Sequence, residues 1–452
     1  MSKQSKQVHF IGIGGVSMSG LAEILHTKGW VVSGSDMKVS EITKRLELLG
    51  IKVYIGHDAK HIADGLDLVV YTAAVKSDNP EYTAASEKGI TLVDRAYLLG
   101  ELMREFGCPI CVSGTHGKTS TTSMITDVLL AADMDPTVSV GGYLPSIGGN
   151  FRMGKSKYFV VESCEYCDSF LKFYPKIGVI LNVDRDHLDY FADLQAIEDS
   201  FARFAKKIPD DGALIIHEGV TKKISENLRC KVITYGLHNA DFIAADIMYN
   251  ADGQPSFTVL KNGKELGRVS LRIHGEHNVL NALAACAASM ETGADFDAVV
   301  RGLSGFIGAK RRFEEKGSFN GVRVIDDYAH HPAEIESTLT ATAKSEHNRV
   351  LCVFQPHTYT RTLALLDEFA HAFKYADTVY VLDIYAAREK DTGLIHAKDL
   401  ADCISAAGTE AIYCSSFDFA EDLIQKKAAP KDLLITIGAG DVYLLGERFV
   451  NS

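Results

Sequence analysis

The feature that most constrains the fold of this chain is a regular alternation between short apolar runs and stretches with helical spacing. The pattern starts at once, with an apolar run over residues 8–15, a helical stretch over 18–29 and another apolar run over 30–36. Strands that alternate with helices in this way are typical of parallel sheets with helices packed on them. We therefore predict an α/β fold.

The alternation is organised in three blocks, each of which opens with a strand-like run and a loop. The first block ends near residue 106, the second covers 107–311, and the third begins near Arg312 and runs to the end of the 452 residues. A chain of this length is expected to form more than one domain. We predict three domains, at 1–106, 107–311 and 312–452.

Polar side chains gather where the predicted strands end. Open α/β sheets bind their ligands beyond the carboxyl ends of the strands. This clustering is therefore the strongest indication, from the residues alone, that the chain is an enzyme. The residues concerned are the segment 114–120 together with Asp36, Glu162, Asp186, His187, Asp326, Asp327, His357 and Asp383.

The segment VSGTHGKTSTT, residues 112–122, is predicted to bind phosphate between a strand and a helix. Gly114 and Gly117 let the main chain approach a phosphate, Lys118 supplies a cation, and the Thr119 hydroxyl is a candidate Mg²⁺ ligand. Val112 stands where the usual phosphate loop has its first glycine, so this is a variant loop. The alternative is a glycine turn before a polar helix. We expect Lys118 to lie on an exposed loop.

Two strand ends offer further ligands for a hard dication. Glu162 ends one apolar strand, and His187 ends the next. Carboxylate oxygens are the ligands that Mg²⁺ prefers, so chemistry alone favours Glu162 over His187.

The N-terminal segment HFIGIGGVSMSG resembles a dinucleotide-binding loop, although Ser17 replaces its third glycine. Asp36 follows the second strand, where a ribose-binding acid is expected. A nucleotide or diphosphate is therefore expected here, and an NAD-dependent oxidoreductase is one alternative. Two phosphate-binding loops in one chain favour an ATP-dependent synthetase that acts on a nucleotide-linked substrate.

Charge and cysteine content limit the other possibilities. The net charge of −12 disfavours nonspecific nucleic-acid binding. No signal peptide or membrane-length apolar run is evident, so we expect a cytoplasmic protein without a membrane partner. Two CxxC pairs, at 108/111 and 164/167, could suggest zinc. Cys108 and Cys111 lie on opposite faces of a predicted strand, so packing or loop thiols are the favoured interpretation.

Six segments, taken together and in order, resemble the Mur ligase family. The pair GTHGKT and DDYAHHP is the most specific, and the resemblance covers nearly the whole chain. The segments are 9–20, 114–122, 275–285 (GEHNVLNALAA), 311–314 (RRFE), 326–332 (DDYAHHP) and 355–362 (QPHTYTRT).

This resemblance implies an N-terminal Rossmann-like domain that binds a UDP substrate, a central P-loop ATPase domain and a C-terminal Rossmann-like domain that binds an amino acid. It implies that ATP and Mg²⁺ phosphorylate a carboxylate, and that an amino acid attacks the acyl phosphate. Within the family, the N-terminal loop favours UDP-N-acetylmuramate and L-alanine as substrates. A branch that attaches a preformed peptide to the same UDP-sugar is the alternative, and a nucleotide-binding regulatory protein without catalysis is another.

The resemblance also implies roles for individual residues. The catalytic set is Lys118, Glu162, His187, His330 and Arg361, with Thr119, Glu162 and His187 as metal ligands. The ATP contacts are Gly114, Thr115, His116, Gly117, Lys118, Thr119, Ser120, Asn278, Asn281, Arg312 and Asp326. The substrate contacts are Gly14, Gly15, Asp36, Tyr328, His330 and Arg361.

Two departures from the family pattern affect the site. Cys164 and Cys167 stand where some relatives carry acids, and Thr358 stands where relatives often carry arginine. Glu162 and Glu165 still match, so one magnesium site is retained.

Overall fold

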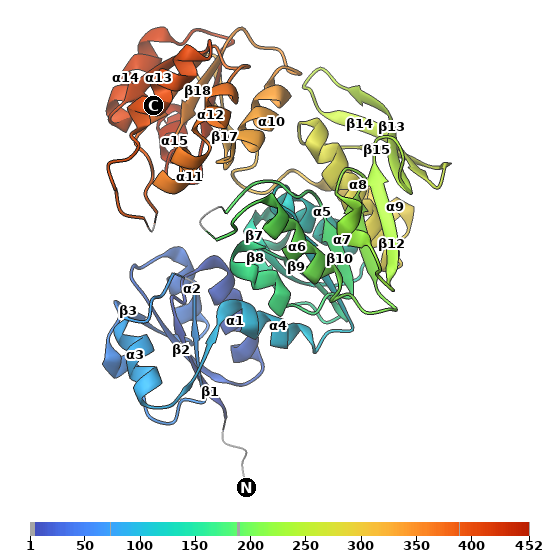
Figure 1. Ribbon diagram of the computed structural model, residues 1–452, viewed down its shortest axis with the longest axis vertical. Helices are drawn as coiled ribbons and strands as arrows, with labels where there is room; N and C mark the ends of the chain where they lie inside the picture. Colours follow the sequence, from blue (N-terminus) through green and yellow to red (C-terminus); the bar gives the residue numbers. More distant parts are fainter. Residues whose placement is uncertain (1–4, 73, 188–189, 388, 452) are drawn as a thin grey trace.

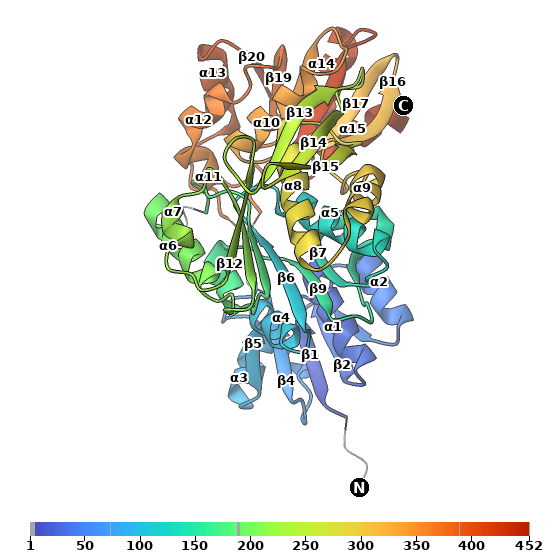
Figure 2. The ribbon, with the colours of Figure 1, turned by 90° about the vertical axis from the view of Figure 1, so that its right-hand side faces the viewer.

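The computed structural model describes residues 5–72, 74–187, 190–387 and 389–451. In this part of the chain the strands form three separate sheets, each with helices packed on it (Figure 1). The first sheet lies at one end of the molecule and the third at the other, with the second between them in both views (Figures 1 and 2). The predicted three-domain α/β class is confirmed, whereas the domain boundaries stay a prediction.

The N-terminal sheet has the order β3-β2-β1-β4-β5, with every pair parallel. Its central strand is apolar and buried at Val8, Phe10 and Ile11, as expected for a strand covered on both faces. The elements are β1 (Gln7–Ile11), α1 (Val16–Thr27), β2 (Val31–Asp36), α2 (Glu41–Leu48), β3 (Lys52–Ile55), η1 (Ala59–His61), β4 (Leu68–Tyr71), α3 (Pro80–Glu87), β5 (Thr91–Asp94) and α4 (Arg95–Met103).

The central sheet has the order β15-β14-β13-β12-β11-β10-β6-β9-β7-β8. It is parallel from β13 to β7, and β14, β15 and β8 add antiparallel edges. The elements are β6 (Cys108–Ser113), α5 (Lys118–Ala131), β7 (Thr137–Leu144), η2 (Pro145–Ile147), β8 (Gly149–Arg152), β9 (Tyr158–Glu162), η3 (Tyr166–Lys172), β10 (Ile177–Ile180), α6 (Leu194–Ala205), β11 (Ala213–His217), α7 (Lys222–Ser225), β12 (Lys231–Gly236), β13 (Phe242–Tyr249), β14 (Pro255–Lys261), β15 (Lys264–Ser270), α8 (Glu276–Glu291) and α9 (Phe296–Gly305).

The C-terminal sheet has the order β16-β17-β21-β18-β19-β20 and is parallel except at β16. Strands β18, β19 and β21 are buried along their whole length. The elements are β16 (Glu314–Phe319), β17 (Val322–Asp327), α10 (Pro332–Thr342), β18 (Val350–Phe354), α11 (Tyr359–Ala364), α12 (Leu366–His371), β19 (Thr378–Leu382), α13 (Ala397–Ala406), β20 (Glu410–Cys414), α14 (Phe417–Lys427), β21 (Leu433–Ile437) and α15 (Tyr443–Asn451).

Two helices that begin at the predicted nucleotide site pack against each other in the central domain. Helices α5 and α8 are in contact, and both contribute to the same hydrophobic core. The small side chains of Ala282, Ala284 and Ala285 on α8 are fully buried, because α8 packs on α5, on α9 and on the strands of the sheet. Over the residues described here, none of the helices has the length and apolar character that a bilayer crossing requires.

Candidate active site

The phosphate loop connects the buried strand β6 to α5, as the sequence predicted. Gly117 has φ +83°, and a Cβ on it would lie 2.6 Å from Oδ1 of Asn281, so this position requires glycine. The main-chain N–H of His116 donates to Oδ1 of Asn182 at 2.7 Å, and the Asn182 amide donates back to the His116 carbonyl at 3.0 Å. The loop is therefore fixed to the chain that follows β10.

The Lys118 ammonium group lies inside this loop rather than on an exposed one, so that expectation was wrong. Its side chain is only 13% exposed, and Nζ donates to the Gly114 carbonyl at 2.5 Å and to Glu165 Oε2 at 3.0 Å. Burial favours the neutral amine, but the Glu165 and Glu162 carboxylates and the hydrogen bond to Glu165 together outweigh it and raise the pKa of Lys118 above its usual value. Lys118 is thus a fixed cation at neutral pH.

Hard oxygen donors meet at the predicted metal position. The Thr119 hydroxyl donates to Oε2 of Glu162 at 3.0 Å, and the Gly141 N–H donates to the same oxygen at 2.7 Å. Thr119, Glu162 and His187 all line one cavity of about 680 Å³, which we call the central cavity. A hydroxyl and a carboxylate side by side are suitable ligands for Mg²⁺.

His187, the third predicted ligand, lies in the segment that follows β10, close to two carboxylates. Its Nε2 lies 3.7 Å from both Glu165 Oε1 and Asp186 Oδ2. Burial lowers the pKa of the imidazole, which leaves it neutral and able to bind a cation. His187 has a backbone φ of +53°, which is uncommon for residues other than glycine.

A second cavity, of about 300 Å³, lies between the start of α5, the start of α8 and α10, and we call it the adenine-side pocket. Asn278 and Asn281 line it from α8, and Asn281 Nδ2 donates to Asn278 Oδ1 at 3.1 Å. His116, Gly117, Ser120 and Arg312 line it as well. These predicted ATP contacts therefore come together.

Asp326 does not reach this pocket. Its fully buried carboxylate accepts from Arg311 Nε at 3.0 Å and from the Thr436 hydroxyl at 2.7 Å. Its neighbour Asp327, on the opposite face of β17, lines the adenine-side pocket. Burial raises the pKa of Asp327 to about 6. We therefore move the expected nucleotide contact from Asp326 to Asp327.

A third cavity, of about 350 Å³, surrounds the predicted amino-acid contacts, and we call it the Arg361 pocket. It is lined by Tyr328, His330 and Arg361, and it shares Tyr328, His330 and His187 with the central cavity. Arg361 Nη2 donates to Oδ1 of Asp186 at 3.0 Å. Burial lowers the pKa of His330 to about 4, so this imidazole is neutral at physiological pH.

The N-terminal loop also reaches the site. The Gly14 N–H donates to Oδ2 of Asp36 at 2.9 Å, so the predicted loop and acid are adjacent, with Gly15 next in the chain. Val16, which begins α1, lines the central cavity, and its carbonyl accepts from Nδ2 of Asn150 at 2.5 Å. Residues of all three domains thus line the central cavity.

Three further residues could together bind a metal ion, although none of them is a predicted metal ligand. They are His116, Asp184 and His331, and their ligand atoms lie within 4.8 Å of one another. Nε2 of His331 is bonded to the Arg185 carbonyl at 2.9 Å, and its Nδ1 accepts from the Ala333 N–H at 3.3 Å. Both ring nitrogens of His331 are therefore occupied, so His331 serves as a contact between domains, whereas Nε2 of His116 faces Oδ2 of Asp184 at 3.9 Å.

Sequence reasoning missed several residues that shape the site. Asn182 and Glu334 both bond to His116, and neither was singled out, whereas Asp327 was noted only as a strand-end acid without a nucleotide role. Asn182 follows an apolar strand, which is the signal that identified the other strand-end residues. Glu334 carries no such signal, because it lies in the first turn of a helix, where acids are common for reasons of helix stability.

The fold and these cavities define a three-domain nucleotide-binding α/β enzyme. Family models described as "Mur ligase family, catalytic domain", "Mur ligase middle domain" and "Mur ligase, glutamate ligase domain" match residues 7–107, 112–289 and 311–440. The chain belongs to the Mur ligase family.

Relatives in this family are similar over almost their whole length. UDP-N-acetylmuramate–L-alanine ligase of Acetivibrio thermocellus is 51% identical, over 98% of this chain and 96% of that protein, and the ligase of the same name from Clostridium botulinum strain Alaska E43 is 50% identical. The crystal structure of UDP-N-acetylmuramate-alanine ligase from Thermotoga maritima matches with a TM-score of 0.83 at 30% identity, over 98% of both chains. A murein peptide ligase from Psychrobacter arcticus matches with a TM-score of 0.74 at 26% identity, over 99% of this chain and 98% of that one.

Proposed function

We propose that this protein is an ATP-dependent ligase that joins L-alanine to the carboxylate of UDP-N-acetylmuramate, for the synthesis of peptidoglycan precursors. The geometric observation that carries the proposal is the continuity of the central cavity with the Arg361 pocket. Lys118, a fixed cation in the phosphate loop, and Arg361, a cation suited to a carboxylate, thereby line adjoining spaces. The names of the relatives at about 50% identity supply the two substrates.

The chemistry explains why ATP is needed. A carboxylate does not react with an amine at neutral pH, because it has no good leaving group. Transfer of the γ-phosphoryl group gives an acyl phosphate, from which phosphate leaves when the amine attacks. Lys118 stabilises the negative charge of the transferring group. The adenine-side pocket, with Asn278 and Asn281, holds the nucleotide on the other side of the loop.

Mg²⁺ is the proposed metal, and Thr119, Glu162 and His187 are its proposed ligands. The adjacent hydroxyl and carboxylate fit a hard dication, and the neutral imidazole of His187 has a lone pair to offer. When bound, Mg²⁺ would reduce the repulsion between the phosphate oxygens and the substrate carboxylate.

Each of the three domains has a proposed role. Residues 1–106 bind the UDP substrate through Gly14, Gly15 and Asp36, residues 107–311 bind ATP, and residues 312–452 bind the amino acid. The contact of Val16 with the central cavity supports this assignment, because it brings the N-terminal loop to the place where the substrate carboxylate must react.

The alternative is a ligase that attaches a preformed peptide, as the name of the Psychrobacter relative indicates for that protein. Its lower identity, 26% against 50–51%, makes this the second candidate. The oxidoreductase alternative receives no support, because the family models cover most of the chain as a Mur ligase.

An isotope experiment tests the reaction. UDP-N-acetylmuramate with an ¹⁸O-labelled carboxylate is incubated with ATP, Mg²⁺ and either L-alanine, glycine, L-serine or a tripeptide. One labelled oxygen should appear in the released phosphate, and L-alanine should be the best acceptor. Unlabelled phosphate would exclude the acyl phosphate, and a preference for the tripeptide would assign the protein to the second candidate.

A further inference from the structure

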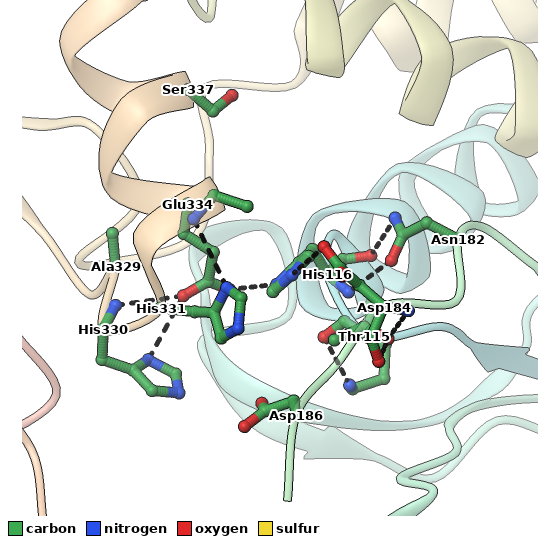
Figure 3. A network of polar contacts seen from close by, with 12 residues as sticks. Thr115, His116, Asn182, Asp184, Asp186, Ala329, His330, His331, Glu334 and Ser337 are labelled. Atoms are coloured by element: carbon green, nitrogen blue, oxygen red, sulfur yellow. Dashed lines mark hydrogen bonds and ion pairs between the residues drawn. The ribbon is translucent and has the colours of Figure 1, made fainter. Parts of the chain in front are cut away.

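The carboxylate of Glu334 connects two parts of the site that belong to different domains. Its Oε1 accepts from Nδ1 of His116, in the phosphate loop, at 3.1 Å. Its Oε2 accepts from the main-chain N–H of His330, in the C-terminal domain, at 3.0 Å. Figure 3 shows Glu334 between these two residues, on the first turn of α10.

Further hydrogen bonds hold each end of this connection. His116 is fixed through its main chain to Asn182, immediately before Gly117 and Lys118. On the other side, His330 Nδ1 bonds to the Tyr328 carbonyl at 3.0 Å, which orients the ring at the boundary between the central cavity and the Arg361 pocket. A displacement of the C-terminal domain would therefore change the position of His330 relative to the phosphate loop.

The surroundings keep this carboxylate ionised although its side chain is only 12% exposed. Burial would raise the pKa of Glu334, but His330, His116 and Arg312 together hold it well below its usual value. Asp327 is the opposing negative group, and it too lines the adenine-side pocket beside Glu334. Hydrogen bonds to an ionised acceptor are shorter and roughly twice as strong as neutral ones, so the charge strengthens both contacts.

We propose that Glu334 is a positioning residue that couples the seating of the C-terminal domain on the phosphate loop to the orientation of His330 in the amino-acid pocket. The inference rests on the proposed ligase reaction, which needs the phosphate loop and the amino-acid pocket in register for both chemical steps. The residue acts through His116 and His330, and it has no proposed contact with the reacting atoms.

The variant that tests this is Glu334→Gln, which keeps the shape and removes the charge. The amide can present its oxygen to only one of the two donors, so one contact is weakened. Misplacement of reacting groups by about 1 Å can cost about 10²-fold in rate, and we expect kcat to fall between about 10- and 100-fold. ATP affinity of the enzyme without other substrates, measured by calorimetry, should stay within about threefold, because the contacts of Asn278, Asn281 and Lys118 remain.

The matched control is Glu336→Gln, two residues along the same helix. Glu336 forms an exposed ion pair with Lys374, with 46% of its side chain accessible, so its loss should leave kcat and ATP affinity unchanged. A kcat of Glu334→Gln within threefold of wild type would overturn the proposal. So would a joint fall in kcat, ATP affinity and melting temperature, which would indicate a purely structural role.

A double-mutant cycle with His116→Ala gives a second measure. If Glu334 acts through His116, the double variant should lose no more kcat than the worse single variant, whereas multiplied losses would contradict the coupling. All ratios are measured with the acceptor that best supports wild-type turnover. If the proposed function is wrong, the acceptor preference of the wild-type enzyme will show it. If only this inference is wrong, the ratio of variant kcat to wild-type kcat will show it.

Discussion

At the scale of single residues, the buried pair of Lys118 and Glu165 links catalysis to stability. Lys118→Met should lower turnover by on the order of 10²–10³-fold, because a fixed cation at the transferring phosphoryl group is lost. It should also destabilise the fold by about 3–5 kcal/mol, since Glu165 is 2% exposed and would keep a buried charge without this partner.

Phosphate release and urea unfolding measure the two effects of Lys118→Met separately. The double variant Lys118→Met with Glu165→Gln is the control, and it should recover stability without recovering turnover. A single variant with more than about a tenth of wild-type activity would remove Lys118 from the mechanism.

The proposed Mg²⁺ site depends most on the carboxylate of Glu162. Glu162→Gln should shift the Mg²⁺ dependence of turnover to concentrations at least about tenfold higher, because a neutral amide is a poor ligand for a hard dication. Affinity for UDP-N-acetylmuramate, measured by calorimetry, should change little. Glu226→Gln, at an exposed position of the same domain, is the control, and a metal titration that matches this control would contradict the assignment.

Aspartates 326 and 327 show how far single residues could be predicted. The sequence placed both at the end of a strand, which is where the structure has them. Side chains alternate across a strand, so only one of the two can face the nucleotide, and nothing in the local sequence says which. The choice is made by the partners of the Asp326 carboxylate, which are Arg311, 15 residues earlier, and Thr436, 110 residues later.

At the scale of elements, the strand–loop–helix unit of β6 and α5 was predictable because its signals are local. An apolar run ends, two glycines follow, and a helical stretch begins. The pairing of Asn182 with His116, 66 residues apart, was not predictable, because it depends on the neighbouring strands β6 and β10 lying parallel and in register. The same reasoning applies to the antiparallel strands β14 and β15, whose β-like sequence did not show at which end of the sheet they are added.

The loop's geometry gives a prediction for this element. Gly117→Ala should lower ATP affinity by at least about tenfold, because the new methyl group would collide with Oδ1 of Asn281, 2.6 Å away, and because φ is +83°. The control is Gly293→Ala, which has φ +100° but open space around it. That control should cost about 1–2 kcal/mol of stability and leave ATP affinity unchanged. The ATP affinity of each variant is measured by calorimetric titration. Equal affinities for the two variants would contradict this account of the loop.

At the scale of the whole molecule, the site is assembled by contacts between domains. His116 with Glu334, the Arg185 carbonyl with His331, and Asp186 with Arg361 each join the central domain to the C-terminal domain over 146–218 residues of sequence. The order of the blocks is readable from the sequence, but such pairings depend on how the domains dock. This is why the candidate residues could be named in advance while their partners could not.

Arg361 provides the prediction that tests this assembly. Its guanidinium uses Nε and Nη2 on Asp186, at 3.3 and 3.0 Å, and lines the pocket proposed for the amino acid. Lysine keeps the charge but loses the planar fork of donors, so it cannot hold Asp186 and a ligand carboxylate at once. A hydrogen bond to a charged group contributes about 1.5–3 kcal/mol, and we therefore expect Arg361→Lys to lower kcat/KM for L-alanine by about 10- to 100-fold.

The first chemical step should respond differently to Arg361→Lys, because Lys118 and the metal ligands stay in place. Positional isotope exchange in ATP, measured with UDP-N-acetylmuramate and without L-alanine, should stay within about threefold of wild type. Arg203→Lys is the control, because 55% of the Arg203 side chain is exposed and its ion pair with Asp168 lines none of the three cavities, and it should affect neither step. Equal losses in both steps would mean that Arg361 holds the domains together without a specific role toward the amino acid. A loss confined to the alanine step would show that the docked domains, and not the central domain alone, form the acceptor site.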